Sequence, residues 1–92
     1  MLPVGNCTII EYRDFYDVPR AMLVQDDAGR RFFFDCPFDD DADEYPDVFD
    51  VYLVREQTWP ASIPGPDWVR VGSVAACDLR LDPTRRKSVS LL

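Results

Sequence analysis

The chain has 92 residues, a formal net charge of −7 and no histidine. This length fits one domain with a small core, and the acidic balance disfavours nucleic acid and anionic membranes, because binding to either depends on clustered lysine and arginine. Without histidine, and without the glycine patterns of phosphate-binding loops, we expect residues 1–92 to form a single non-enzymatic domain with no catalytic residue and no cofactor.

Short runs of β-branched and aromatic residues, separated by turn residues, recur along the whole sequence. No helical period spans about 11 residues or more. The pattern is therefore all-β, with strands expected over residues 7–13, 20–25, 30–34, 48–55, 68–75, 77–81 and 88–92. So many short strands favour a small SH3-like or related barrel of 5–7 strands, since closure removes exposed edges, and a two-layer β-sandwich is the alternative.

In the first run, strict alternation places Ile10 and Tyr12 on one face and Ile9, Glu11 and Arg13 on the other. Residues 14–19 interrupt the pattern before the second run begins.

The second and third runs are joined by Asp26-Asp27-Ala28-Gly29. A glycine at the end of such a turn predicts a positive φ, and the two runs predict a β-hairpin.

Aromatic residues dominate one face of the third run, where Phe32, Phe34, Cys36 and Phe38 alternate with Phe33 and Asp35. Pro37 lacks a backbone donor and therefore predicts that pairing ends near this position. In the fourth run the inward residues are expected to be Phe49, Val51 and Leu53, and those near solvent Asp50, Tyr52 and Arg55.

Three features follow the fourth run. Residues 57–67 contain three prolines and predict a rigid loop. The fifth and sixth runs are either two strands or one strand bent near Gly72. Residues 82–85, with aspartate first and proline second, predict a type I turn.

Acidic side chains crowd the connection between the third and fourth runs, and residues 34–50 contain no base. Aligned on an EF-hand loop, Asp39, Asp41, Asp43, Asp47 and Asp50 fall at ligand positions 1, 3, 5, 9 and 12, and Tyr45 at position 7. The sharp-turn position holds Glu44 instead of glycine, position 8 holds Pro46, and both flanks resemble strands. These departures argue against an EF-hand and lead us to expect no metal site, with a looser calcium or magnesium site as an alternative.

The same connection suits recognition of a basic surface, because aromatics and prolines lie among its carboxylates. A solvated spacer that protects a sheet edge is an equally weighted alternative, and mimicry of nucleic-acid phosphates is a further one. The candidate partner-binding residues are Phe38, Asp39, Asp40, Asp41, Asp43, Glu44, Tyr45 and Asp47. In this hypothesis Tyr45 and Phe38 supply the apolar anchor.

Two other surfaces are candidates. Acids and aromatics of residues 11–17 suggest, by analogy of fold only, the peptide groove of an SH3 domain, with Trp59 or Trp68 completing an aromatic wall. A loop covering the mouth of a barrel is the favoured alternative for these residues. The basic cluster consists of Arg80, Arg85, Arg86 and Lys87, and it could pair with the acidic connection.

Cys7, Cys36 and Cys77 have no CxxC spacing, so we expect three reduced thiols rather than a disulfide or a zinc site. The beginning of the chain lacks the features of a signal peptide, and no apolar run reaches about 18 residues. These observations predict a cytoplasmic protein with no membrane span.

Taken together, the sequence predicts a non-enzymatic acidic module that binds a basic protein partner, with no direct contact to nucleic acid or membrane. Immunity proteins, which are small acidic single domains that neutralise toxins, share this general profile, although no motif links the chain to one of their families. The hypothesis is therefore an inhibitor of a basic partner such as a toxin. A nucleic-acid mimic, or an accessory domain that binds a peptide or calcium or magnesium, is the alternative.

Overall fold

The structure is a computed structural model that describes residues 2–3, 6–15, 19–55, 68–81 and 88–91. Within these residues the chain is all-β, with one short 3-10 helix, η1 (Ala76–Asp78), between the fifth and sixth strands. The strands are β1 (Asn6–Phe15), β2 (Pro19–Gln25), β3 (Arg31–Asp35), β4 (Val48–Val54), β5 (Val69–Ala75), β6 (Leu79–Leu81) and β7 (Ser88–Leu91). The all-β prediction is confirmed. The sequence left open whether the fifth and sixth runs form one strand or two, and the structure has two, which makes seven strands among the described residues.

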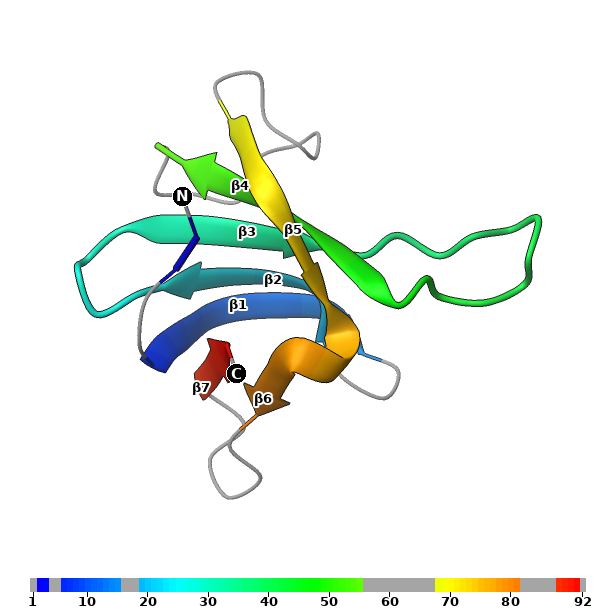
Figure 1. The fold of residues 1–92 in the computed structure, drawn as a ribbon, viewed down its shortest axis with the longest axis horizontal. Helices are drawn as coiled ribbons and strands as arrows, with labels where there is room; N and C mark the ends of the chain where they lie inside the picture. The colour runs from blue at the N-terminus through cyan, green and yellow to red at the C-terminus, as the bar shows by residue number, and fades with distance from the viewer. Residues whose placement is uncertain (1, 4–5, 16–18, 56–67, 82–87, 92) are drawn as a thin grey trace.

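Neighbouring strands pair antiparallel in the order β5-β4-β3-β2-β1-β7-β6. The sheet curls strongly, so that β5 crosses in front of β3 and β4, and η1 leads from its lower end to β6, which lies below β1 beside β7 (Figure 1). The strands at the two ends of the order, β5 and β6, follow one another in the sequence through η1. They do not pair with each other among the described residues, so these pairings leave the sheet open.

The inner side of the curl holds the larger apolar cluster. Met22, Phe34 and Val51 lie opposite one another on three adjacent strands, so their side chains point to the same side. All three are completely buried. The other buried members of the cluster are Cys7, Ile9, Val24, Phe32, Cys36, Phe49 and Val74. The inward face predicted for β4 is therefore confirmed, with Leu53 half-buried against it. The aromatic face expected for the third run is buried from Phe32 to Cys36, whereas Phe38 is 43% exposed.

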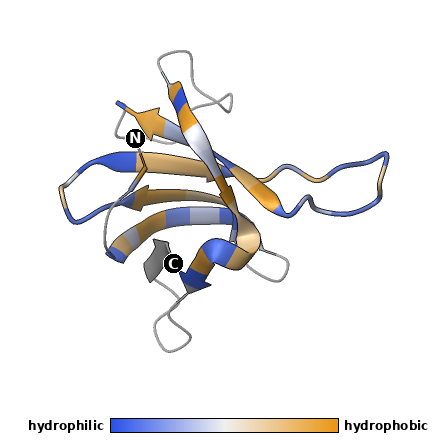
Figure 2. Ribbon diagram, in the orientation of Figure 1, coloured by the Kyte–Doolittle hydropathy of each residue, from blue (hydrophilic) through white to orange (hydrophobic). Residues whose placement is uncertain are grey.

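A second apolar cluster covers the outer face of the sheet, where the sequence pattern gave little reason to expect one. Leu23, Phe33 and Tyr52 are register partners on β2, β3 and β4, and Trp68 lies against them. The buried members are Ala21, Leu23, Phe33, Val54 and Trp68. The central parts of β2 and β3 are thus buried on both faces, and Figure 2 shows them in hydrophobic colours. Tyr52, expected near solvent, is half-buried against this cluster.

A bulge in β1 makes the predicted faces of that strand wrong. The register with β2 shifts between Ile9, which pairs with Val24, and Glu11, which pairs with Leu23. Since Val24 belongs to the inner cluster and Leu23 to the outer one, Ile9 and Glu11 lie on opposite faces. The extra residue, Ile10, is 44% exposed. One inserted residue is enough to break strict alternation.

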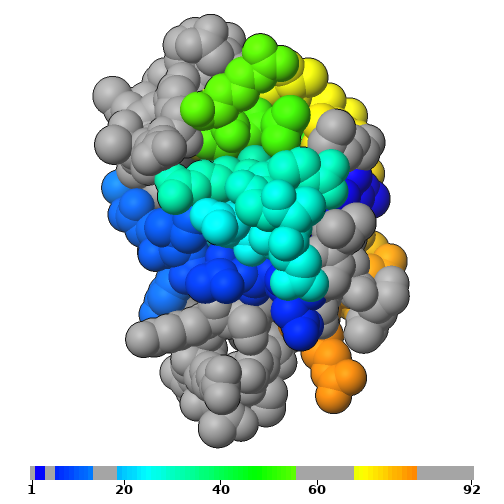
Figure 3. All heavy atoms as spheres, turned by 90° about the vertical axis from the view of Figure 1, so that its left-hand side faces the viewer, coloured from blue at the N-terminus to red at the C-terminus, as the bar shows by residue number. Residues whose placement is uncertain are grey.

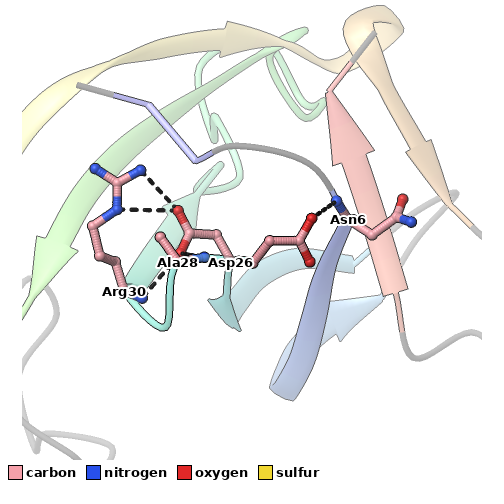
Figure 4. A network of polar contacts seen from close by, with 5 residues as sticks. Asn6, Asp26, Ala28 and Arg30 are labelled. Carbon is pink, nitrogen blue, oxygen red and sulfur yellow. Dashed lines mark hydrogen bonds and ion pairs between the residues drawn. The ribbon is translucent and has the colours of Figure 1, made fainter.

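The predicted β2–β3 hairpin is confirmed. Gly29 has a φ of 82°, and its amide donates to the Asp26 carbonyl at 3.0 Å. Asp26 Oδ1 accepts the amides of Ala28 and Arg30 at 3.1 and 2.9 Å, while Oδ2 accepts the Arg30 guanidinium (Figure 4). Asp27 Oδ2 accepts the Asn6 amide, which links the turn to the start of β1. The turn lies between β1 and the end of β4 in Figure 3.

The fifth and sixth runs are separate strands, broken at η1 rather than at Gly72. A register shift does occur beside Gly72, which pairs with Val51 while Arg70 pairs with Tyr52. The predicted rigid loop over residues 57–67 and the type I turn over 82–85 lie outside the described residues.

Cys7, Cys36 and Cys77 form no disulfide with one another, and Cys7 and Cys36 are buried whereas Cys77 is exposed. None of the helices in the described part of the chain is long and apolar enough to cross a membrane.

Candidate functional site

The acidic connection between β3 and β4 forms a narrow hairpin, residues 37–47, here called the acidic hairpin. It extends past the end of the sheet, on the side opposite the β2–β3 turn (Figure 1). Its flanks are strands, as the sequence predicted, and not the helices of an EF-hand. In Figure 2 it is mostly hydrophilic, in contrast to the strands that carry it.

The tip of the acidic hairpin is closed by backbone hydrogen bonds. The amide of Asp39 donates to the Glu44 carbonyl at 2.8 Å, and the Glu44 amide donates to the Asp39 carbonyl at 3.2 Å. Within the turn, Asp39 Oδ1 accepts the amides of Asp41 and Ala42 at 3.0 and 3.3 Å. Asp43 has a φ of 53°, in the left-handed region that aspartate tolerates better than most residues. The hairpin therefore has a defined backbone and is more than a run of acids.

The two predicted anchor aromatics contact each other across the hairpin. The rings of Phe38 and Tyr45 meet edge to face, with centroids 5.1 Å apart. Tyr45 is half-buried against the inner cluster, whereas Phe38 is 43% exposed. Tyr45 therefore attaches the hairpin to the core, and Phe38 is the aromatic available to a partner.

A buried arginine holds the base of the hairpin. Arg20, at the start of β2, is only 4% exposed. Its Nη1 donates to the Pro46 carbonyl at 3.0 Å and lies 3.4 Å from Cys36 Sγ. Its guanidinium carbon lies 5.2 Å from the centre of the Tyr45 ring and 5.8 Å from that of Phe49, which is cation–π range.

Two further contacts fix the base. The Cys36 thiol donates to the Pro46 carbonyl at 3.1 Å. In addition, the amide of Ala76, at the start of η1, donates to the Asp47 carbonyl at 2.7 Å. The segment of the hairpin that leads back to β4, here called the returning limb, is therefore also held by η1. The limb is therefore fixed from two different parts of the fold.

The predicted acidic residues are brought together on this hairpin and all are exposed: Asp39, Asp40, Asp41, Asp43, Glu44 and Asp47. Ion pairs among the described residues include those of Arg13 with Glu11, Arg30 with Asp26 and Arg70 with Asp50, and none of these three uses a carboxylate of the hairpin. An open depression beside Phe38 is lined by Pro37, Phe38, Asp39, Asp40, Asp41 and Pro46. This surface can offer carboxylates and one aromatic ring to a cationic group.

A convergent metal site is not formed by the described residues, because no three or more of their cysteine and carboxylate side chains gather in a way that could hold an ion. The EF-hand-like spacing of the aspartates therefore does not translate into a ligand shell in this structure.

The second candidate surface lies only partly within the described residues. Trp68, expected to complete its wall, is 8% exposed and packed into the outer cluster. Tyr12 is 48% exposed on β1, while residues 16 and 17 and Trp59 lie outside the described residues. Of the basic cluster, Arg80 is exposed and residues 85–87 lie outside the described part.

Sequence reasoning missed Arg20. A signal was present, because Arg20 is the one charged residue in PRAMLVQ, a strand that is otherwise apolar except for its final glutamine. A charge in a strand of that kind is rarely buried without partners.

No protein-family model, curated protein or solved structure matches the chain.

Proposed function

We propose that this protein is a non-enzymatic binding module that uses its acidic hairpin to recognise a basic protein partner. The observation that carries the proposal is that six exposed carboxylates project on a hydrogen-bonded hairpin. The ion pairs Arg13–Glu11, Arg30–Asp26 and Arg70–Asp50 of the described residues do not involve these carboxylates. Carboxylates arranged in this way attract and orient a cationic surface, and Phe38 beside them supplies apolar contact area.

The class of activity that fits best is inhibition of a basic partner such as a toxin, in the manner of an immunity protein. An inhibitor needs a fixed surface more than a reactive one, and the hairpin base is held by Arg20, Tyr45 and Ala76. The three free thiols agree with a reducing cytoplasmic location, which stays a prediction.

For the fold, we propose a partly open barrel of the small SH3-like or related class rather than a two-layer sandwich. One inner cluster draws residues from β1 to β5, from η1 and from β6, which supports a single curled sheet around one core.

Binding of an octa-arginine peptide, as a stand-in for a basic surface, tests the function. One triple variant neutralises the hairpin (Asp40→Asn, Asp41→Asn, Glu44→Gln), and a matched variant neutralises three acids elsewhere (Glu11→Gln, Asp27→Asn, Asp78→Asn). Each changes the formal charge from −7 to −4 by removing three negative charges. Any difference between them therefore reports where the charge lies.

We expect the hairpin variant to bind at least about threefold more weakly than the matched variant, and to lose more of the salt dependence, because each exposed ion pair contributes roughly 0.2–1 kcal/mol. Isothermal titration at two salt concentrations gives both quantities. Equal affinities and equal salt dependence in the two variants would contradict the proposed function.

A further inference from the structure

We propose that Arg20 is a positioning residue for the acidic hairpin, which acts through Pro46 and Tyr45 to fix the direction in which the carboxylates project. This inference deepens the proposed function and rests on it. It assigns a role to a side chain that does not itself reach the binding surface, since Arg20 is buried and the carboxylates are exposed.

The first argument is topological. Arg20 lies on β2, whereas Pro46 lies on the limb that returns to β4, and β3 separates these two strands in the sheet. No ladder of backbone hydrogen bonds connects β2 to β4. The contact from Arg20 Nη1 to the Pro46 carbonyl, at 3.0 Å, is thus a link from the middle of the sheet directly to the returning limb.

The second argument concerns the backbone. Proline has no N–H, so at position 46 the carbonyl is the only backbone group that can be held by a hydrogen bond. Both Arg20 and the Cys36 thiol donate to it. The backbone of Arg20 also accepts the Cys36 amide at 2.7 Å, which ties the outgoing limb to the same residue. One residue therefore holds both limbs where they leave the sheet.

The third argument concerns the aromatic pair. The guanidinium of Arg20 lies 5.2 Å from the Tyr45 ring centre, and the Tyr45 ring meets the exposed Phe38 ring edge to face. The contacts run without interruption from Arg20 through Tyr45 to Phe38. A hairpin held in this way loses less conformational entropy when a partner binds than one that must first be ordered.

Two substitutions test the role. Arg20→Met keeps the aliphatic stem and removes the guanidinium, whereas Arg20→Lys keeps a charge and a donor but loses the planar group that lies against Tyr45. Hydrogen exchange of the Asp39 and Glu44 amides, which close the hairpin, reports its order. The amides of Ala28 and Arg30, held by Asp26 at the opposite end of the molecule, are the internal control.

We expect Arg20→Met to accelerate exchange of the Asp39 and Glu44 amides about tenfold relative to the Ala28 and Arg30 amides. Binding of octa-arginine should weaken at least about threefold, although no surface charge has changed. Arg20→Lys should recover part of both effects, because an ammonium can still donate to the Pro46 carbonyl. If Arg20→Met does not fold, the comparison of Arg20→Lys with the wild type carries the test.

Three results would overturn the inference: unchanged exchange at Asp39 and Glu44 in a folded variant, an equal acceleration at all four amides, or faster hairpin exchange with unaltered peptide affinity. The second would mean that Arg20 serves only global stability. Failure of the proposed function has a different signature, because there the hairpin-neutralised and matched variants would bind octa-arginine equally.

Discussion

The indole of Trp68 lies over the ring of Phe33 on the outer face of the sheet, with 4.9 Å between ring centroids. Trp68 immediately precedes β5 and Phe33 is in the middle of β3, so the contact reaches across β4, where Trp68 also meets Tyr52. Trp68 thus shields the apolar side chains on the outer face of the sheet from solvent.

Substitutions at Trp68 measure how much this side chain contributes to the free energy of unfolding. We expect Trp68→Ala to lower the free energy of unfolding by about 3–5 kcal/mol, as for other large buried aromatics. Trp68→Phe should cost clearly less, because it keeps a ring over Phe33 and removes a buried indole N–H that has no hydrogen-bond acceptor among the described residues. Denaturant unfolding of the two variants measures the difference. Equal losses would show that the ring contact contributes little.

The turn between β2 and β3 depends on one buried carboxylate. Asp26 accepts two backbone amides and the Arg30 guanidinium, and its side chain is fully buried. Asp26→Ala should therefore destabilise the protein by about 2–4 kcal/mol. The exposed neighbour Asp27, whose carboxylate accepts the Asn6 amide, is the matched position, and Asp27→Ala should cost less than about 1 kcal/mol. Thermal or denaturant melting compares them, and similar costs would disprove the assignment.

Alkaline pH should weaken the fold through Cys7. Burial raises the pKa of this thiol from 9.0 to about 11, and the carboxylates of Asp26 and Asp27 add to the shift. The folded state thus holds the proton more tightly than the unfolded chain does. Stability from this group is complete below pH 9 and declines between about pH 9 and 11.

Comparison of the wild type with Cys7→Ala isolates this contribution, because every other titratable side chain is the same in both proteins. The difference in unfolding free energy between them should shrink steadily as the pH rises from about 8 to about 10.5. A difference that stays constant over this range would rule out the proposed thiol titration.

Phe38 should matter for binding and hardly for stability. Because its side chain is 43% exposed, Phe38→Ala should change the unfolding free energy by less than about 1 kcal/mol. As the proposed aromatic anchor, it should weaken octa-arginine binding about fivefold or more. Val69, 50% exposed on β5, provides a control: Val69→Ala removes similar exposed apolar surface outside the acidic hairpin and should leave binding unchanged. Equal effects of the two substitutions would remove Phe38 from the site.

Features encoded over a few neighbouring residues could be predicted. The β2–β3 hairpin follows from two apolar runs joined by a turn that ends in Gly29, and the inner face of β4 follows from the alternation of Phe49 and Val51. The exposure of the acids in the hairpin was expected as well, since carboxylates are rarely buried without partners.

The bulge in β1 and the outer cluster could not be predicted in this way. Strict alternation of faces holds only in an uninterrupted strand. Ile10 is the extra residue in the pairing of β1 with β2, and nothing in the neighbouring sequence identifies it as such. The burial of Phe33 depends on Trp68, which is 35 positions away and reaches it only after the chain has crossed the sheet.

By itself, therefore, the sequence determined that this protein is all-β, that it is acidic, and that its carboxylates crowd one connection between two strands. Local periodicity and composition are sufficient for those properties, because each depends on residues close together in the chain. The tertiary structure decided what that connection is. It brings Arg20 against Pro46 and Tyr45, residues 26 and 25 positions further along, and so turns an acidic loop into a hairpin with a fixed base, because contacts between distant segments exist only after the sheet has curled.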